Sequence, residues 1–118
     1  MWKTIFLIGL LHGSATFDAW TTNRVINALP CQEGNPIYRP FAGKPTMYVA
    51  TNLAVVPIDI WLLSGRRKKL ARVVAVVVTG WQMRAAVKNM HTYSKWYPLY
   101  ERWWKEREAA GLPTNWKH

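Results

Sequence analysis

Residues 2–29 read WKTIFLIGLLHGSATFDAWTTNRVINAL, and Pro30 follows them. The run from Ile5 to Leu11 is apolar throughout, and the helical pattern can continue until the proline ends it. Asp18 lies inside this helix. If the helix crosses a bilayer, the carboxylate needs a polar partner, because an uncompensated charge at membrane depth is costly. The segment therefore predicts a membrane helix with one polar side.

The apolar residues of the 118-residue chain gather into three blocks, at about 4–28, 46–63 and 70–88. The segments between the blocks are rich in proline, glycine and basic residues. A helix of about 20 residues is long enough to cross the hydrocarbon core of a bilayer. We therefore predict an all-α, multi-pass membrane protein with three transmembrane helices.

The formal net charge is +10, which by itself would suit a nucleic-acid ligand. The cations, however, lie beside the apolar blocks, and Arg66–Lys69 separates the second block from the third. Because this placement is typical of membrane flanks, we predict the lipid bilayer and other membrane subunits as partners, and no nucleic acid. The positive-inside rule puts Arg66–Lys69 in the cytoplasm and the C-terminus on the opposite side. Arg24, Arg39, Lys44 and the basic tail favour the inverse orientation, which stays open.

The N-terminus has a second interpretation as a cleaved signal peptide. Residues 1–3 would be its charged end, residues 4–11 its apolar core and residues 13–15 its small-residue cleavage site. The helical pattern continues past this site without a break, which favours a retained membrane helix. Both interpretations remain open.

The first block carries a polar stripe. Asp18 follows Ser14 by four residues, and Thr21 and Thr22 follow Asp18 by three and four, so these side chains share one helix face. Such a stripe predicts hydrogen bonds to a neighbouring helix, from this chain or from another subunit.

Three further residues of the first block are candidates for close contacts. Gly9 and Gly13 form a small-xxx-small pair, which would let another helix approach closely. His12 lies on a different face from the polar stripe. It is either a hydrogen-bonded packing residue or an axial ligand for haem or chlorophyll.

The second and third blocks contain further polar residues. In an up-down-up arrangement, Asp18, Asn52 and Arg84 fall at one depth, and Asp59 and Arg72 fall at another, near the hairpin loop. Because paired charges are tolerated in a membrane better than single ones, we predict an Asp18–Arg84 contact with Asn52 nearby. We also predict a separate Asp59–Arg72 contact.

The connection at residues 30–45 contains four prolines and two glycines, which predicts a stiff, turn-rich segment docked on the helices or the bilayer. Together with the first helix it carries two short motifs, Asp18-x-x-Thr21 and Glu33-x-Asn35-Pro36. In these motifs the chain resembles an uncharacterised family of small bacterial multi-pass membrane proteins. The similarity covers about the first half of the chain. It implies a location in the bacterial inner membrane and brings no known reaction.

The tail, residues 91–118, is basic and rich in tryptophan, and we treat it as a unit distinct from the three-helix domain at residues 1–90. Pro98 suits the first turn of a helix over about 98–110. Four aromatic residues share one side of this region: Trp96, Tyr100, Trp103 and Trp104. The pattern predicts an amphipathic helix anchored at the membrane interface. The competing interpretation is a stacking platform for single-stranded nucleic acid.

No catalytic motif is visible in the sequence. His91 and His118 lie in the tail, Cys31 lies in a loop, and there is no glycine-rich phosphate loop or zinc-ligand spacing. We therefore expect a protein that is not an enzyme.

The leading functional hypothesis is an accessory or structural subunit of a larger integral membrane complex, which docks through polar and small-residue helix faces. One alternative is a small homo-oligomeric channel or carrier that uses Asp18, Asn52 and Asp59. A weaker alternative is a pigment- or haem-binding subunit that ligates through His12. Apart from that possibility, we predict no cofactor and no metal.

Overall fold

The computed structural model describes residues 2–29 and 37–112, which form three long α-helices. They are α1 (Trp2–Ala28), α2 (Thr46–Ser64) and α3 (Lys68–Ala109). The prediction of an all-α fold is confirmed, and the bounds of the first two helices lie close to those expected.

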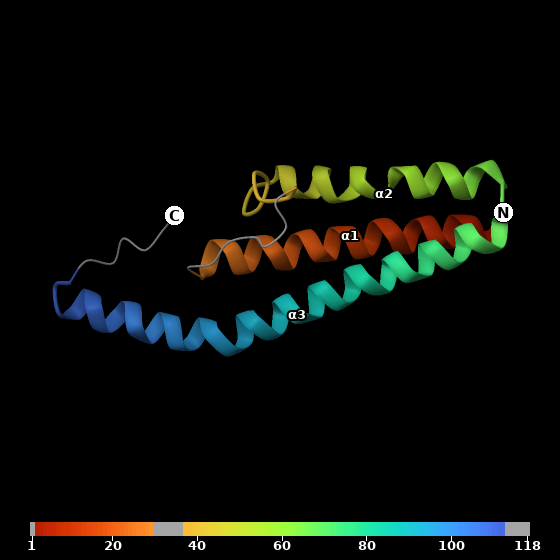
Figure 1. Cartoon of the computed structure of the whole chain (residues 1–118). Helices are drawn as coiled ribbons and strands as arrows, with labels where there is room; N and C mark the ends of the chain where they lie inside the picture. The colour runs from red at the N-terminus through yellow and green to blue at the C-terminus, as the bar shows by residue number, and fades with distance from the viewer. Residues whose placement is uncertain (1, 30–36, 113–118) are drawn as a thin grey trace.

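The helix α1 lies between the other two helices, antiparallel to α2 and parallel to α3 (Figure 1). The hairpin between α2 and α3 lies beside the N-terminal end of α1, which gives the expected up-down-up order (Figure 1). Within the described ranges, no hydrogen bond joins α2 directly to α3. The first helix is therefore the element on which the other two are assembled.

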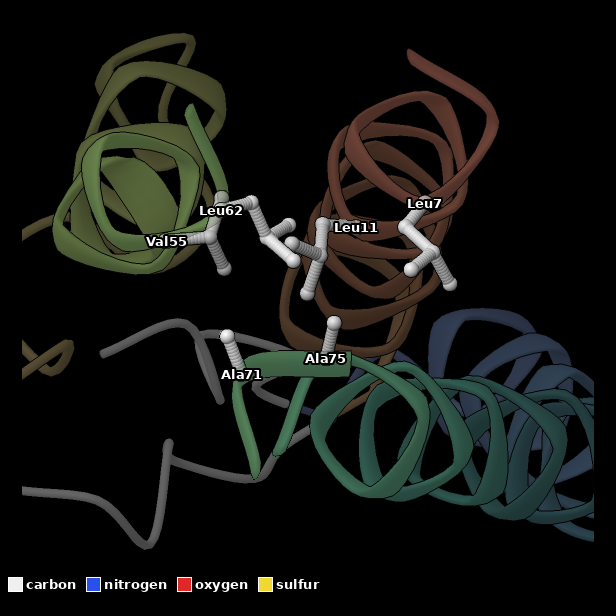
Figure 2. Packing of buried hydrophobic residues seen from close by; sticks show 6 residues of the cluster. All are labelled: Leu7, Leu11, Val55, Leu62, Ala71 and Ala75. Carbon is white, nitrogen blue, oxygen red and sulfur yellow. The ribbon is translucent and has the colours of Figure 1, made fainter. Parts of the chain in front are cut away.

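The apolar core is small and lies towards the hairpin end of the bundle. Figure 2 shows side chains of all three helices that meet there: Leu7, Leu11, Val55, Leu62, Ala71 and Ala75. The alanines of α3 are almost fully buried, and their small side chains let α3 approach α1 closely.

No helix of the described chain makes the close approach that we expected at Gly9 and Gly13. A Cβ added at either glycine would meet nothing within 4 Å, and both residues are exposed. The reason is rotational, since two residues along a helix correspond to about 200°. Because Leu11 and Ala15 are fully buried, Gly13 between them faces outwards.

Two helices, α2 and α3, are long and apolar enough to cross a membrane, as judged by length and composition. Only 22% of the apolar window of α2 and 17% of that of α3 is buried, whereas the core helix of a soluble protein would be mostly buried. The helix α1 does not meet the same criterion, so the prediction of three such helices is confirmed only in part. His12, Ser14, Thr16 and Asp18 lie close together in α1 and make it more polar.

The separate tail helix that we expected to begin at Pro98 does not exist. The helix α3 continues through Pro98 and contains 42 residues, against 27 in α1 (Figure 1). Proline removes one backbone hydrogen bond, but the turns around it are held by ring contacts. Tyr93 stacks on Tyr97 with centroids 4.8 Å apart, and Tyr100 stacks on Trp103 at 5.6 Å. The proposed division at residue 90 falls inside this helix.

The turn between α2 and α3 is short and cationic. Gly65 ends α2 with a φ of 72°, a left-handed conformation that glycine adopts without strain. Arg67 precedes α3 with a φ of 47°, which is uncommon for a residue with a side chain. The run Arg66–Lys69 therefore lies at one end of the bundle, in the helical hairpin expected from the sequence.

The described part of the first connection is docked on α1. Asn23 donates to the carbonyl oxygen of Lys44 at 2.9 Å and accepts from the amide of Gly43 at 2.7 Å, and Asn27 donates to the Gly43 carbonyl oxygen at 3.1 Å. The two asparagines are one helical turn apart, so they hold the loop from one face of α1. The motif residues Glu33, Asn35 and Pro36 lie outside the described residues, as do Cys31 and His118.

Candidate functional site

A polar network joins α1 to α2. His12 contacts the Oδ1 atom of Asn52 through Nδ1 at 2.8 Å, and it contacts the Oδ2 atom of Asp59 through Nε2. Asn52 also donates from Nδ2 to the carbonyl oxygen of Tyr48 at 2.8 Å and to Thr16 Oγ1 at 3.2 Å. The Asp59 side chain is 14% exposed and that of His12 is 33% exposed. Two ionisable groups and an amide are thus gathered between α1 and α2.

The hydrogen-bond directions fix how many protons this network holds. Because the Asn52 amide nitrogen donates elsewhere, its oxygen accepts from His12 Nδ1–H. One further proton then lies between His12 Nε2 and Asp59 Oδ2, on either the ring or the carboxyl group. In both arrangements the pair has no net charge, which makes its burial less costly than that of a single ion.

One atom of the network is unsatisfied. The second carboxyl oxygen of Asp59, Oδ1, is buried and has no hydrogen-bond partner among the described residues. A buried acceptor without a donor costs free energy, and it costs more on a carboxylate than on a neutral carboxyl group. The burial of Asp59 is therefore more sensitive to a change at His12 than the burial of any other residue in the network.

A second set of polar contacts joins α1 to α3. Ser14 donates to Gln82 Oε1 at 2.5 Å, and Asn89 donates from Nδ2 to Thr21 Oγ1 at 3.2 Å and to Thr22 Oγ1 at 3.0 Å. The Ser14–Gln82 and Thr21–Asn89 pairs are both separated by 68 residues, which is the signature of two parallel helices in fixed register. The polar stripe of α1 is thus largely satisfied within the chain.

Gln82 and Asn89 are the site residues that the sequence interpretation missed. They are seven residues apart on α3, so they share a face after two turns. That spacing matches the spacing of Ser14 and Thr21 on α1. Comparing polar residues at a seven-residue spacing between the first and third blocks would have found them.

The predicted Asp18–Arg84 contact is wrong. Thr22 Oγ1 donates to Asp18 Oδ1 at 3.4 Å, and no ion pair joins Asp18 to Arg84 in the part of the chain that the structure describes. Arg84 is exposed. Because Gln82 faces α1, a residue two positions further along points to the opposite side of α3.

Asp18 instead lines a groove of about 580 Å³ between the three helices. Side chains from every helix contribute to it, including Thr51 of α2 and Gln82 and Asn89 of α3. An acidic group thus faces the interior of the bundle.

The predicted Asp59–Arg72 contact is also wrong, because Asp59 pairs with His12. Arg72 lies at the hairpin end, where it lines a hollow of about 210 Å³ with Thr4 and Lys68. The depth of Asp59 in the bundle was compatible with either partner, and the rotation of α2 decides between them.

The geometry of His12 does not favour its role as a haem or chlorophyll ligand. Both ring nitrogens are engaged, one by Asn52 and the other by Asp59. An axial ligand needs a free nitrogen lone pair, so metal coordination would require one of these contacts to break.

The aromatic residues of the tail lie along the last turns of α3. Trp96 and Trp103 are 48% and 41% exposed, whereas Tyr100 and Trp104 are half-buried. Cations cover two of the rings. Lys95 Nζ lies 5.1 Å from the ring centroid of Trp96. Arg107 Cζ lies 4.9 Å from the ring centroid of Trp103. Burial raises the pKa of the Tyr100 hydroxyl. This part of α3 therefore presents mixed aromatic and cationic surface.

Comparison of the chain with known protein families, with curated proteins and with solved structures finds no match. The family resemblance carried by Asp18-x-x-Thr21 and Glu33-x-Asn35-Pro36 is therefore neither confirmed nor contradicted.

Proposed function

We propose that the chain is an integral membrane protein that serves as a non-catalytic accessory or structural subunit of a larger membrane complex. The observation that supports a membrane location best is the direction of the side chains. The polar groups of α1 turn towards α2 and α3, whereas large apolar side chains turn outwards. Prominent among the exposed apolar residues are Val49, Leu53, Ile60, Leu63, Val73, Val76, Val77 and Val87. In water such a surface would be unfavourable, and in lipid it is the expected one.

In this proposal α1 is the third transmembrane helix. It lies beside α2 and beside the first part of α3, so it occupies the same depth as these segments do (Figure 1). Its polar residues lower its hydropathy, but His12, Ser14 and Thr21 meet polar partners on the neighbouring helices. A helix whose polar groups are satisfied by its neighbours is tolerated in a bilayer even when it would not insert alone.

The outer face of α1 supports a docking role. Six residues at alternating spacings of four and three form an exposed stripe on α1: Trp2, Phe6, Gly9, Gly13, Thr16 and Trp20. Thr16 lies at the edge of the stripe towards α2, where it accepts a hydrogen bond from Asn52. This spacing is that of a helix–helix seam, and the two glycines at its centre would let a partner backbone approach closely. We propose that a helix of another subunit packs on this stripe.

The experiment that tests this role is native purification in a mild detergent after leucine has been introduced at Gly9 and Gly13. The double variant should fold, because the added side chains meet nothing within 4 Å of their Cβ atoms. It should nevertheless lose co-migration with the large assembly. Gly80→Leu is the matched control, since Gly80 lies in α3 and is equally open. Co-migration that survives at Gly9 and Gly13, or that is lost equally at Gly80, would contradict docking through this stripe.

For location and orientation, we propose the bacterial inner membrane with Arg66–Lys69 in the cytoplasm and the C-terminus on the opposite side. The aromatic and cationic surface at Trp96, Tyr100, Trp103 and Trp104 would then lie at the far interface. Reporter fusions at Lys69 and at the C-terminus test this orientation, because a reporter that is active only in one compartment should respond at one position alone.

The alternative function is a small homo-oligomeric channel or carrier. Two observations favour it: the contact between the ionisable side chains of His12 and Asp59, and the groove that Asp18 lines with polar residues of all three helices. Self-oligomers in the same native purification, together with proton flux into proteoliposomes that Asp59→Asn abolishes, would favour the channel over the accessory subunit. A visible absorption band in the purified protein would instead support the hypothesis of pigment binding at His12.

A further inference from the structure

A pocket of about 340 Å³ lies where the C-terminal end of α1 meets α3. Its wall combines a cation, hydroxyl groups and aromatic rings, contributed by Thr21, Arg24, Met90, Tyr93, Ser94 and Tyr97. The His12–Asp59 network uses other residues. The Asp18 groove shares Asn89 with this pocket and is otherwise lined by different residues.

Arg24 is held by stacking alone. Its guanidinium carbon lies 4.3 Å from the ring centroid of Tyr93 and 5.2 Å from that of Trp20, so α1 and α3 both supply a ring. Among the described residues Arg24 has no ion pair and no hydrogen bond. Stacking covers the faces of a guanidinium and leaves its N–H groups at the edge available. The guanidinium of Arg24 therefore has a fixed position, and its N–H donors have no acceptor among the described residues.

The remaining wall suits a phosphate group attached to an apolar tail. The hydroxyl of Ser94 is exposed and has no hydrogen-bond partner in the described chain, so it can donate beside the guanidinium. Arg24 can bind two phosphate oxygens at once, which is the geometry that makes arginine a preferred phosphate ligand. The stacked rings of Tyr93 and Tyr97 and the side chain of Met90 supply apolar surface next to this position.

The level of the pocket in the bundle fits a lipid headgroup. It lies just beyond the third apolar block, which ends at about residue 88, and in the last turns of α1. Asn23, next to Arg24, holds the docked loop at Gly43 and Lys44. Tyrosine and tryptophan prefer this zone of a bilayer, and the phosphate groups of the lipids lie in it.

We infer that this pocket binds the phosphate group of an anionic phospholipid, with Arg24 as its principal ligand. The inference rests on the proposed membrane location. The negative charge of the lipid neutralises a cation that no carboxylate of the described chain pairs with, and the acyl chains follow the exposed apolar surface of α3.

The test is native mass spectrometry of the full-length chain in detergent, titrated with phosphatidylglycerol or with phosphatidylcholine. The wild-type chain should retain one phosphatidylglycerol with an affinity about tenfold above that for phosphatidylcholine, and Arg24→Gln should lower the affinity for phosphatidylglycerol about tenfold. Arg84→Gln is the matched control, because it removes one exposed arginine of α3 that does not line the pocket. It should change the affinity less than twofold.

If Arg24→Gln does not fold, Ser94→Ala replaces it and should weaken phosphatidylglycerol binding about threefold. Equal losses of phosphatidylglycerol affinity in Arg24→Gln and Arg84→Gln would show that binding depends only on the overall charge, and would overturn the inference. Displacement of the lipid by millimolar inorganic phosphate would make free phosphate the ligand and overturn the lipid assignment. Alkaline extraction of membranes tests location separately: if wild type and Arg24→Gln both stay in the membrane while selectivity is absent, only the lipid site fails.

Discussion

His12 of α1 and Asp59 of α2 form the ionisable contact between these two helices, and the proton that they share leaves the pair with no net charge. Asn52 fixes the ring by accepting from its other nitrogen. The arrangement resolves the problem of placing ionisable groups in an apolar helix pair, because each group neutralises the other. It also makes the two residues interdependent.

Replacing either partner alone should therefore be more harmful than replacing both. His12→Ala leaves Asp59 with two unsatisfied buried oxygens, and we expect it to lower the free energy of unfolding by about 3 kcal/mol. Adding Asp59→Ala removes the carboxyl group that has lost its partner. The double variant should therefore lose less unfolding free energy than the two single variants lose in sum. Unfolding of all variants in mixed detergent micelles measures the cycle. Strict additivity would mean that the contact contributes nothing.

The contact of Asn89 with Thr21 and Thr22 should fix the parallel register of α1 and α3. Asn89→Ala removes the donor to both hydroxyl groups, and we expect a loss of about 1 kcal/mol. Lys88→Ala is the control, because Lys88 is its exposed neighbour on the same helix. A loss of the same size in both variants would show that helix propensity, rather than the interhelical contact, is being measured.

Much of the fold could be predicted from the sequence because it depends on one-dimensional features. The bounds of α1 and α2 follow from the apolar blocks and from the breakers beside them, Pro30, Pro45 and Gly65. The up-down-up order follows from the short cationic hairpin. The long α3 was missed because a proline is compatible both with a first turn and with a helix interior.

The candidate site was harder to predict because it depends on rotation about each helix axis. Comparing depths put Asp18 level with Arg84, but Gln82 is the residue that faces α1, and Arg84 points away from it. Likewise, the sequence predicts His12 on a different face from the polar stripe, as a hydrogen-bonded packing residue or an axial ligand, but it does not show that α2 brings Asp59 to it. Hydropathy constrains the depth of a residue in the membrane, and spacing constrains which residues share a face of one helix. Only packing sets how the faces of two helices meet.

Gly43 should be required for the docked loop. Its φ is 80°, and a Cβ would lie 2.8 Å from Asn27 Oδ1 and 3.1 Å from a methyl carbon of Ile26. Gly43→Ala therefore combines left-handed strain with a clash against the residue that holds the loop, and we expect a loss of about 2 kcal/mol. Thermal unfolding measures it. Gly111→Ala separates the two causes, because Gly111 has a φ of 71° and open space around it. If both variants lose the same amount, the contact with Asn27 is not a constraint.

The C-terminal part of α3 should respond to alkaline pH through Glu101 and Lys105. The Lys105 Nζ atom lies 2.9 Å from Glu101 Oε1, one turn away, and the hydrogen bond and charge of Glu101 raise the pKa of Lys105 above its ordinary value of 10.5. Because the folded pKa is raised, the contribution of the pair is present below pH 10.5 and is lost as pH rises through the folded pKa. NMR titration of the lysine should show the pKa returning towards 10.5 in Glu101→Gln and staying raised in Glu106→Gln. An unchanged pKa in Glu101→Gln would mean that the pair does not persist in solution.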